Sequence, residues 1–160
     1  MDISTGQPAR TSSLFSGSPP SKAVDGNLGR THPNQFHMSC TVDFWEAGWW
    51  GVELKHASNN FDITFYARDC CTLGNYGGQL SIWMSNDWPD NNTPWDTWSK
   101  ASDAVHCNDF LVQDSGTVKI SCLNLAVSYS YIFVRPTAAT KLVVSKLERW
   151  STIKNGCLDF

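Results

Sequence analysis

The sequence predicts an all-β sandwich, and three observations lead to that fold class. Short stretches in which apolar and polar residues alternate recur along the 160-residue chain, which is the pattern of half-buried strands. Gly, Pro and Asn residues separate these stretches, as turns do in sandwiches and barrels. Helical periodicity is not sustained in any stretch. The length suits a single domain over 1–160, with a core over about 6–150 and a C-terminal tail over 151–160.

The first third of the chain contains few strand signals. Residues 6–22 are rich in Gly, Ser and Pro and predict an irregular or edge segment. Residues 25–40 predict a long polar loop. The first clear strand covers 49–54 and begins with Trp49 and Trp50, of which we expect one in the core and the other half-exposed.

Three of the remaining predicted strands alternate clearly. In the stretch 61–67, for example, Phe61, Ile63 and Phe65 occupy alternate positions. Since successive side chains of a strand point to opposite faces, these three residues should share the face toward the core. The same reasoning predicts strands at 61–67, 79–85 and 117–123, and the stretches 129–136 and 141–150 complete the list of predicted strands.

The stretch 86–103 reads as a loop and carries Trp88, Trp95 and Trp98 together with four Asp residues. Indole rings stack on sugar faces and carboxylates accept hydrogen bonds from hydroxyl groups, so this stretch is a candidate carbohydrate-binding surface. The alternative is that the three rings close the open end of the sandwich. The eight Trp residues of the chain indicate a core together with an aromatic-rich surface or pocket.

Composition and motifs argue against several classes of function. The net charge is −3 and the chain has no basic block, so a nucleic-acid partner is not expected. No apolar run approaches the roughly 20 residues of a membrane span. The sequence contains no nucleophile elbow, no HExxH motif and no phosphate-binding loop. We therefore expect a binding protein rather than an enzyme.

The six cysteines predict disulfides rather than a zinc site. Their number is even, and no pair has the CxxC spacing that zinc sites use. Because disulfides persist in oxidising compartments, we expect a secreted or extracellular protein. The adjacent Cys70 and Cys71 allow two interpretations. They form a covalent brace for a binding loop, or they form a redox pair in which Arg68 stabilises a thiolate.

Six motifs between Gly6 and Trp150 occur in the order of one known family. They read GQPARTSS, SKAVDGN, FHMSCT, WWGVEL, ITFYARDCC and YIFVRPTAATKLVVSKLERW. With these motifs the chain resembles the F-type lectins, or fucolectins, which are fucose-binding jelly-roll domains related in fold to the discoidin modules. The resemblance implies a jelly-roll β-sandwich with a discoidin-like galactose-binding fold, and a function in carbohydrate binding.

The resemblance also implies a sugar-binding loop. In the family, the pair that corresponds to Cys70 and Cys71 forms a vicinal disulfide, whose flat apolar ring supports the methyl group of a deoxysugar. Arg68 takes the place of a sugar-binding arginine, and we expect Asp69 to orient it through an ion pair. His37 matches a family histidine and is either a sugar ligand or a loop histidine bonded to the backbone.

The chain departs from the family at two polar ligands. The family histidine that follows the SCT motif is Val42 here, and the second arginine is Gly74. The first arginine is Arg68 when the preceding strand anchors the alignment and Ala67 when the DCC motif does. A charge-assisted hydrogen bond contributes about 1.5–3 kcal/mol, so losing two would weaken binding by roughly two to four powers of ten. We expect an altered fucose-type pocket or, as the alternative, a non-carbohydrate recognition or adhesion module on this scaffold.

The family also holds a structural calcium ion, which takes six to eight oxygen ligands. A family glutamate that binds it is Lys146 here. The Lys146 ammonium group either replaces the ion by donating to the same carbonyl oxygens, or points to solvent while Glu148 becomes the ligand. The calcium ligands that the resemblance implies, several of them through backbone carbonyls, are Lys22, Asp25, Asn27, Ser39 and Ser145.

The resemblance assigns the remaining disulfides and partners. Cys107 and Cys122 match a family bridge between two later strands. The family partner of Cys40 is Ser145 here, so we predict a Cys40–Cys157 bridge, which leaves no free thiol. The expected partners are glycans, including fucosylated ones. Since lectins gain strength from several linked sites, a homo-oligomer or a larger multidomain chain is also compatible with the sequence.

Overall fold

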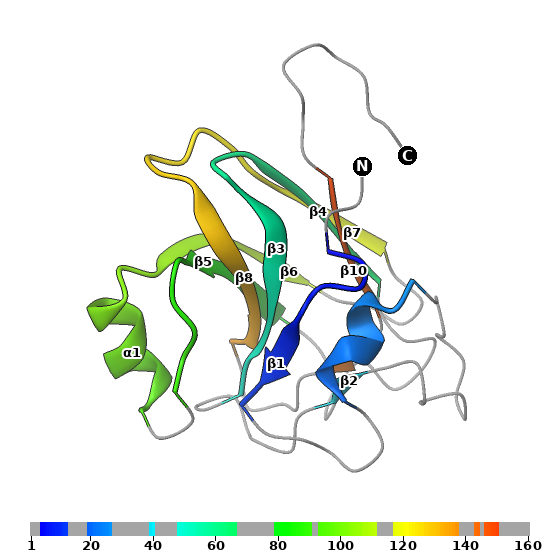
Figure 1. Cartoon of the computed structure of the whole chain (residues 1–160), viewed down its shortest axis with the longest axis horizontal. Coiled ribbons are helices and arrows are strands. Elements are labelled where there is room, and N and C mark those ends of the chain that lie inside the picture. Colours follow the sequence, from blue (N-terminus) through cyan, green and yellow to red (C-terminus); the bar gives the residue numbers. More distant parts are fainter. Residues whose placement is uncertain are drawn as a thin grey trace.

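A computed structural model gives the architecture of the chain (Figure 1). Within the residues that it describes, the chain forms ten β-strands, a 3-10 helix (η1) and one α-helix (α1). For 39–40, 143–144 and 146–150 the backbone alone is described. The described residues are 4–12, 19–26, 39–40, 48–66, 79–90, 93–111, 117–137, 143–144 and 146–150.

The larger sheet has five strands, and every neighbouring pair in it is antiparallel. Its strand β5 and its strand β8 have the bounds that the sequence predicts. Its edge strand β6 was missed because polar residues at 106, 108 and 109 interrupt the apolar alternation. In spatial order the strands are β1 (Ala9–Thr11), β3 (Trp50–Ser58), β8 (Tyr129–Pro136), β5 (Gln79–Ser85) and β6 (Val105–Leu111).

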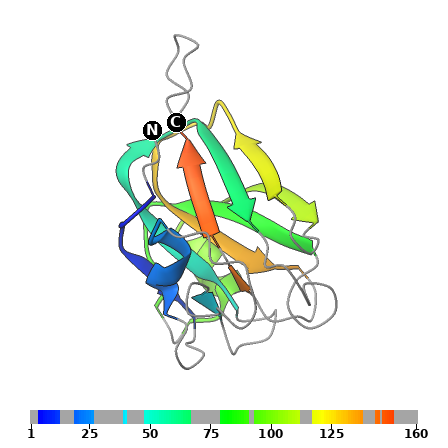
Figure 2. The ribbon, with the colours of Figure 1, turned by 90° about the vertical axis from the view of Figure 1, so that its right-hand side faces the viewer.

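A three-stranded sheet packs against the larger one. Figure 2 shows its strands β10, β4 and β7 side by side. The predicted strand over 141–150 is divided in the structure, because its first part pairs with β2 and its second part with β4. The elements are β10 (Lys146–Trp150), β4 (Phe61–Tyr66) and β7 (Thr117–Cys122), with β2 (Ser39–Cys40) and β9 (Val143–Val144) as a separate pair.

The main core lies between these two sheets. Alternating side chains from both sheets meet there and exclude water, which confirms the predicted inward faces. The 3-10 helix η1 (Pro20–Val24) adds Ala23 and Val24 to the same cluster. Fully buried members of this core include Trp50, Phe61, Ile63, Phe65, Leu80, Ile82, Met84 and Ile132.

The prediction of a loop over 86–103 was wrong in part, because the helix α1 (Trp95–Ala101) lies within it. The N–H groups of Thr97 and Trp98 each donate to the Pro94 carbonyl at 3.0 Å and begin the helix. Seven residues are too few for periodicity to be visible, and so short a helix depends on tertiary packing. None of the helices in the described ranges is long and apolar enough to cross a membrane.

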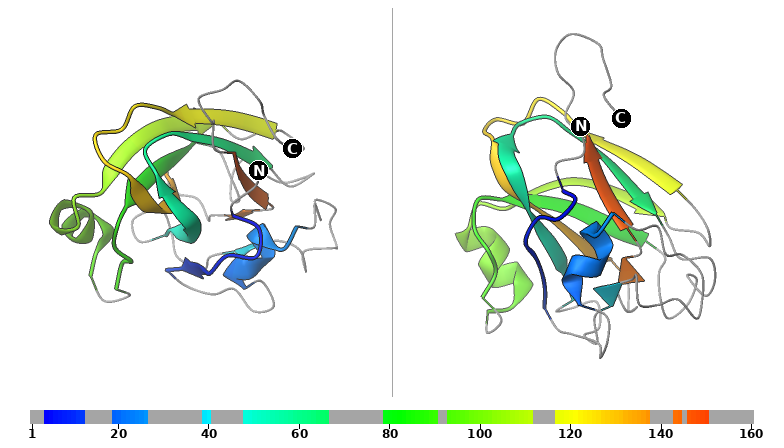
Figure 3. Two further views of the ribbon diagram at one scale, coloured as in Figure 1. Left: turned by 45° about the horizontal axis from the view of Figure 1, so that its top comes forward. Right: turned by 45° about the vertical axis from the view of Figure 1, so that its right-hand side comes forward.

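The helix covers the outer face of the five-stranded sheet. In Figure 1 and in both views of Figure 3, α1 lies on one side of that sheet, whereas η1 and β10 lie on the other. This arrangement corrects the prediction that one of Trp49 and Trp50 is half-exposed, since both are buried. Trp50 enters the main core and its Nε1 donates to the Pro20 carbonyl at 3.0 Å. Trp49 is buried in a second cluster on the outer face.

Candidate functional site

The predicted sugar-binding residues lie outside the described part of the chain. Residues 67–78 contain Arg68, Asp69, Cys70 and Cys71, and residues 27–38 contain His37. The strands that border the first segment are described, because β4 ends at Tyr66 and β5 begins at Gln79. The roles of these five residues stay predictions.

The segments to which the resemblance assigns calcium do come together. The 3-10 helix η1, which contains Lys22, contacts both β2 and β10. These strands contain Ser39 and Lys146, whose side chains are not among those described. Asn27 and Ser145 lie outside the described residues. The fold therefore brings the predicted ligand segments together, but it does not place their ligand atoms.

The described atoms of this region do not by themselves form a calcium site. Asp25 supplies a carboxylate on the exposed surface, and the described residues contain no cluster of three or more metal-binding side chains. Two nearby carbonyls already accept hydrogen bonds, that of Val24 from the Gly6 N–H and that of Pro20 from Trp50. Since calcium needs six to eight oxygens, both the ion and its replacement by Lys146 stay predictions.

The predicted Cys107–Cys122 disulfide is present. It joins β6, at the edge of the larger sheet, to β7, at the edge of the smaller one, with the two Cα atoms 5.8 Å apart. The bridge therefore links the two layers that enclose the main core. The Cys70–Cys71 and Cys40–Cys157 bridges fall outside the described side chains and stay predictions.

A second apolar cluster covers the outer face of the five-stranded sheet, and it consists almost entirely of aromatic rings. Phe133 of β8 is at its centre and is fully buried. Five other rings contact it, with centroid separations from 5.3 to 6.5 Å. We call this set the outer aromatic cluster; its members are Trp49, Trp83, Trp88, Trp95, Trp98, Tyr131 and Phe133.

Gly51 leaves room for the Phe133 ring. The two residues are register partners on β3 and β8. A Cβ atom on Gly51 would come within 2.6 Å of the Phe133 ring and 2.9 Å of the Trp88 ring. A strand glycine of this kind marks a close approach by another group, and here that group is the centre of the outer aromatic cluster.

Of the two interpretations of the stretch 86–103, the sugar-stacking surface is contradicted for Trp95 and Trp98. Their exposed fractions are only 3% and 7%, since both rings pack on Phe133. The alternative, a packing role, is closer, although the rings cover the outer face of a sheet rather than the open end of the sandwich. Trp88 is half-buried beneath the Arg10 guanidinium, which lies 4.9 Å from its ring centroid.

Trp83 is the member of the cluster that lies next to the polar part of the outer face, and it is half-buried. Its register partner on β6 is His106. Two positions earlier on β5, Ser81 pairs with Asp109 of β6 and Arg135 of β8. Because residues i and i+2 of a strand share a face, the sheet brings these polar side chains beside the indole.

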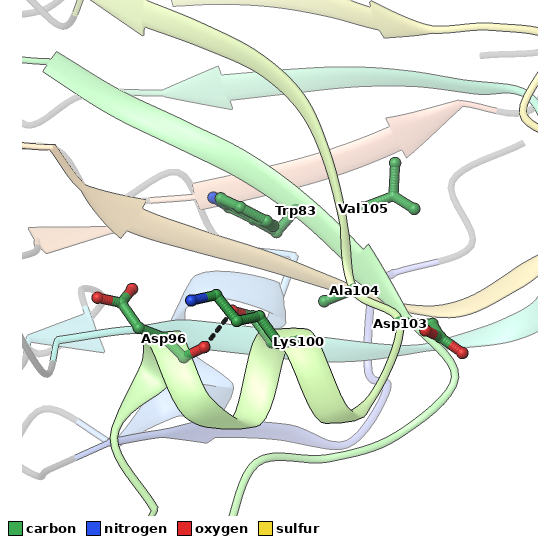
Figure 4. Close-up of a pocket in the computed structure, with 7 residues that line it drawn as sticks. Trp83, Asp96, Lys100, Asp103, Ala104 and Val105 are labelled. Carbon is green, nitrogen blue, oxygen red and sulfur yellow. Dashed lines mark hydrogen bonds between the residues drawn. The ribbon is translucent and has the colours of Figure 1, made fainter.

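Two surface grooves meet Trp83. One has a volume of about 500 Å³ and is lined by Trp83, Ser81, His106, Asp109 and Arg135, with Pro136 and Thr137 at its end. The other, of about 480 Å³, lies between Trp83 and α1. Figure 4 shows Asp96 and Lys100 extending from α1 beside Trp83, whereas Asp103 lies past the far end of the helix.

The polar groups beside Trp83 are held in place by one another. Trp83 Nε1 donates to Ser81 Oγ at 3.1 Å, and this hydroxyl donates to the Arg135 carbonyl at 3.4 Å. His106 Nε2 and Asp109 Oδ1 are 2.8 Å apart. The imidazole also packs on the indole with ring centroids 5.1 Å apart. These contacts fix the groove wall formed by β5 and β6.

Arg135 is oriented by the aromatic cluster. Its guanidinium lies 4.8 Å from the centroid of the Trp95 ring and 3.9 Å from Asp96 Oδ1. Burial lowers the pKa of Arg135 from its ordinary value, and the Asp96 carboxylate acts in the opposite direction. Arginine stays charged near neutral pH despite such a shift. The groove is therefore lined by a cation that the cluster already holds in one orientation.

This surface was not predicted from the sequence. The alternation of 79–85 places Trp83 opposite the buried face of its strand, so the pattern could have predicted that its indole points outward. The positions of His106 and Asp109 beside this indole could not be predicted, because both residues lie on the unpredicted strand β6. Arg135 lies on a correctly predicted strand, but its stacking on Trp95 depends on α1.

Comparison with known proteins identifies the fold. No family model matches the chain, and no curated protein sequence matches it. The fucolectin from striped bass (Morone saxatilis) serum matches in structure with a TM-score of 0.74 and 18% identity, covering 99% of this chain and 48% of that one. The chain has the fold of the F-type lectins. It spans about half the length of the striped bass protein.

Two further solved structures extend this comparison. The lectin domain of lectinolysin, complexed with Lewis B antigen, matches with a TM-score of 0.67 and 19% identity, over 96% of this chain and 98% of that one. The family 32 module of NanJ from C. perfringens, in complex with galactose, matches with a TM-score of 0.67 and 13% identity, over 92% and 96%. The predicted β-sandwich and the predicted resemblance in fold are confirmed.

Proposed function

We propose that this chain is a carbohydrate-binding module, a lectin, rather than an enzyme. The observation that carries this proposal is the match of nearly the whole fold to lectin and carbohydrate-binding modules. The solved relatives cover 92–99% of the chain, and two of them are complexes with Lewis B antigen and with galactose. A match of this extent covers nearly the complete scaffold, including the strand ends from which binding loops extend.

The proposed primary site is the segment between β4 and β5, with Arg68, Asp69 and the Cys70–Cys71 pair as sugar ligands and His37 nearby. Both ends of this segment are held by described strands. Tyr66 pairs with residues of β7 and β10. The Gln79 carbonyl accepts hydrogen bonds from both the N–H and the hydroxyl of Thr137, at 3.0 and 2.9 Å. A binding loop with fixed ends loses less conformational entropy when it binds.

We propose an altered specificity for this site. Val42 and Gly74 stand where the family has a histidine and an arginine, so fucose itself should bind weakly. Arg68 still offers a planar set of donors, and a Cys70–Cys71 ring would offer an apolar surface. Secretion is part of the same proposal, supported by the Cys107–Cys122 bridge, since such bridges persist in oxidising compartments.

The test is a glycan array with the wild-type protein and the Arg68→Ala variant, with and without EDTA. Lys55→Ala is the matched control, because Lys55 is an exposed cation on β3. We expect the wild type and Lys55→Ala to bind the same glycans and Arg68→Ala to lose at least about tenfold in affinity, the loss of one charge-assisted hydrogen bond. An effect of EDTA on wild-type binding would support a calcium ion beneath the loops.

A different outcome would favour the second candidate function. If the folded wild type binds no glycan, carbohydrate binding by this chain is contradicted. Recognition of a non-carbohydrate partner then becomes the better proposal. The residues that favour this candidate are Val42 and Gly74, because they remove polar groups from the family's sugar-binding set.

A further inference from the structure

The outer face of the five-stranded sheet contains a groove surface that the loop site does not explain. We define the Trp83 surface as Trp83 together with Ser81, His106, Asp109 and Arg135. All five residues lie on β5, β6 and β8, and none of them belongs to the segment 67–78. Other large rings of the outer aromatic cluster, such as Trp95 and Trp98, are buried by packing, whereas Trp83 remains half-buried.

The geometry of the grooves suits a small polar ligand. Trp83 lines both of them, and their volumes of about 500 and 480 Å³ fall within the roughly 300–1,000 Å³ of small-ligand sites. Such sites combine apolar or aromatic walls with a few placed polar groups. The groove of Arg135 has this composition, since an indole and an imidazole lie beside a carboxylate, a guanidinium and two hydroxyl groups.

The polar groups of the Trp83 surface are oriented before any ligand arrives. The Arg135 side chain is only 11% exposed and stacks on the Trp95 ring, with the exposed Asp96 carboxylate 3.9 Å away. His106 is fixed by Asp109 and by the Trp83 ring. Groups that are held in this way do not lose rotamer freedom on binding. A surface that merely covers a sheet does not need this many fixed polar groups around an aromatic ring.

The charges of the surface select a neutral ligand. Arg135 is compensated by Asp96 at 3.9 Å, and a protonated His106 would be compensated by Asp109 at 2.8 Å. No cation is left in excess for a phosphate or carboxylate ligand. The side chains that line the neighbouring groove include one lysine, Lys100, and two aspartates, Asp96 and Asp103, a balance that also argues against an anionic ligand. Hydroxyl groups can both donate to the carboxylates and accept from the guanidinium.

We propose that the Trp83 surface is a second carbohydrate-binding site that takes a neutral saccharide, with one sugar ring beside the indole. The exposed parts of Asp109 and His106 bind sugar hydroxyls, and the Arg135 guanidinium donates from the groove floor. The ligand class rests on the proposed function, whereas the position of the site rests on the geometry of the sheet. Two sites on one module would raise the avidity for a branched or clustered glycan.

The variants that test this proposal are His106→Ala and Asp109→Ala. Their side chains are 41% and 45% exposed, so neither substitution should unfold the protein. His56→Ala and Asp87→Ala are the matched controls, because both residues are exposed and line neither groove. Circular dichroism of each variant verifies the fold. Trp83→Phe serves to assign the Trp83 indole N–H resonance.

The measurement is an NMR titration of the indole N–H resonances with galactose, fucose and Lewis B saccharide as neutral probes and sialic acid as a charged probe. We expect a saturable shift of the Trp83 resonance with at least one neutral probe. We also expect the affinity at this site to fall about tenfold in His106→Ala or Asp109→Ala. The controls His56→Ala and Asp87→Ala should titrate as the wild type does.

Repeating the titration with Arg68→Ala separates the two sites. A Trp83 shift that persists in Arg68→Ala and is weakened by Asp109→Ala supports the second site, whatever happens at the loop. A Trp83 resonance that none of the neutral probes moves overturns it. If glycan binding is then lost in Arg68→Ala alone, the proposed function stands without the second site. A Trp83 shift with sialic acid only would contradict the choice of a neutral ligand.

Discussion

The two faces of the five-stranded sheet are both buried, but by different means. The inner face packs aliphatic and aromatic side chains against a second sheet. The outer face packs aromatic rings beneath a two-turn helix and the loop before it. Ile132 and Phe133, neighbours on β8, are both fully buried and belong to opposite faces. Exposure of one sheet face therefore cannot be inferred from alternation alone, because aromatic residues from a short helix can cover it.

The largest loss of stability is expected when a buried side chain on either face of β8 is replaced by alanine. Phe133→Ala should cost about 3–5 kcal/mol of unfolding free energy, and Ile132→Ala about 2–5 kcal/mol. Urea unfolding monitored by tryptophan fluorescence measures both. Similar losses would establish the outer aromatic cluster as a second core. A loss below about 1 kcal/mol for Phe133→Ala would show that its rings are a surface layer.

The disulfide is expected to have the next largest effect. The Cys107→Ala/Cys122→Ala double variant should lose about 2–4 kcal/mol, because the bridge joins the edges of the two sheets around the inner core. The indole N–H resonances of Trp95 and Trp98 in the NMR spectrum of the folded variant should remain like those of the wild type, since the outer cluster does not contain the bridge. A change in these resonances would contradict the separation of the two clusters.

Gly51→Ala should have a smaller effect that is specific to the outer face. The new methyl group would overlap the Phe133 ring, and overpacking of this kind costs about 1–3 kcal/mol. Ala57→Val, at an exposed position of the same strand, is the control and should change the stability by no more than about 0.5 kcal/mol. Equal stabilities of Gly51→Ala and the wild type would mean that the ring can move away.

The smallest expected effect is a pH dependence at the edge of the outer cluster. Burial, followed by the Glu53 carboxylate, raises the pKa of Tyr131 above its ordinary value of 10.0. The neutral phenol is therefore favoured in the folded state, and stability should fall as the pH rises from about 10 through the raised pKa of Tyr131. Tyr131→Phe should flatten this alkaline slope in unfolding measurements. An unchanged slope would assign it to other groups.

Alternation predicted the inner face because its strands bury one side against a sheet of the same kind. The bounds of β5 and the burial of Phe61, Ile63 and Phe65 follow from it. The outer face was less predictable. Its helix has only seven residues, and β6 carries polar residues that interrupt the pattern. Trp95 and Trp98 therefore suggested a sugar surface, although in the structure they fill the cluster.

Of the two candidate sites, one could be predicted from the sequence and the other could not. The loop residues Arg68, Cys70 and Cys71 came from the resemblance, and their chemistry could be argued from the motif alone. The Trp83 surface depends on cross-strand register, which places His106 and Arg135 on the same face as the indole. Register is a tertiary property, so no local pattern in the sequence could have assembled these residues.

The most direct test of the central claim is a glycan array with the folded wild-type protein at low and physiological salt. We predict binding to neutral glycans that contain fucose or galactose, with little salt dependence, since hydroxyl groups rather than charges are recognised. A blank array from protein with a native circular dichroism spectrum would contradict carbohydrate binding at both sites.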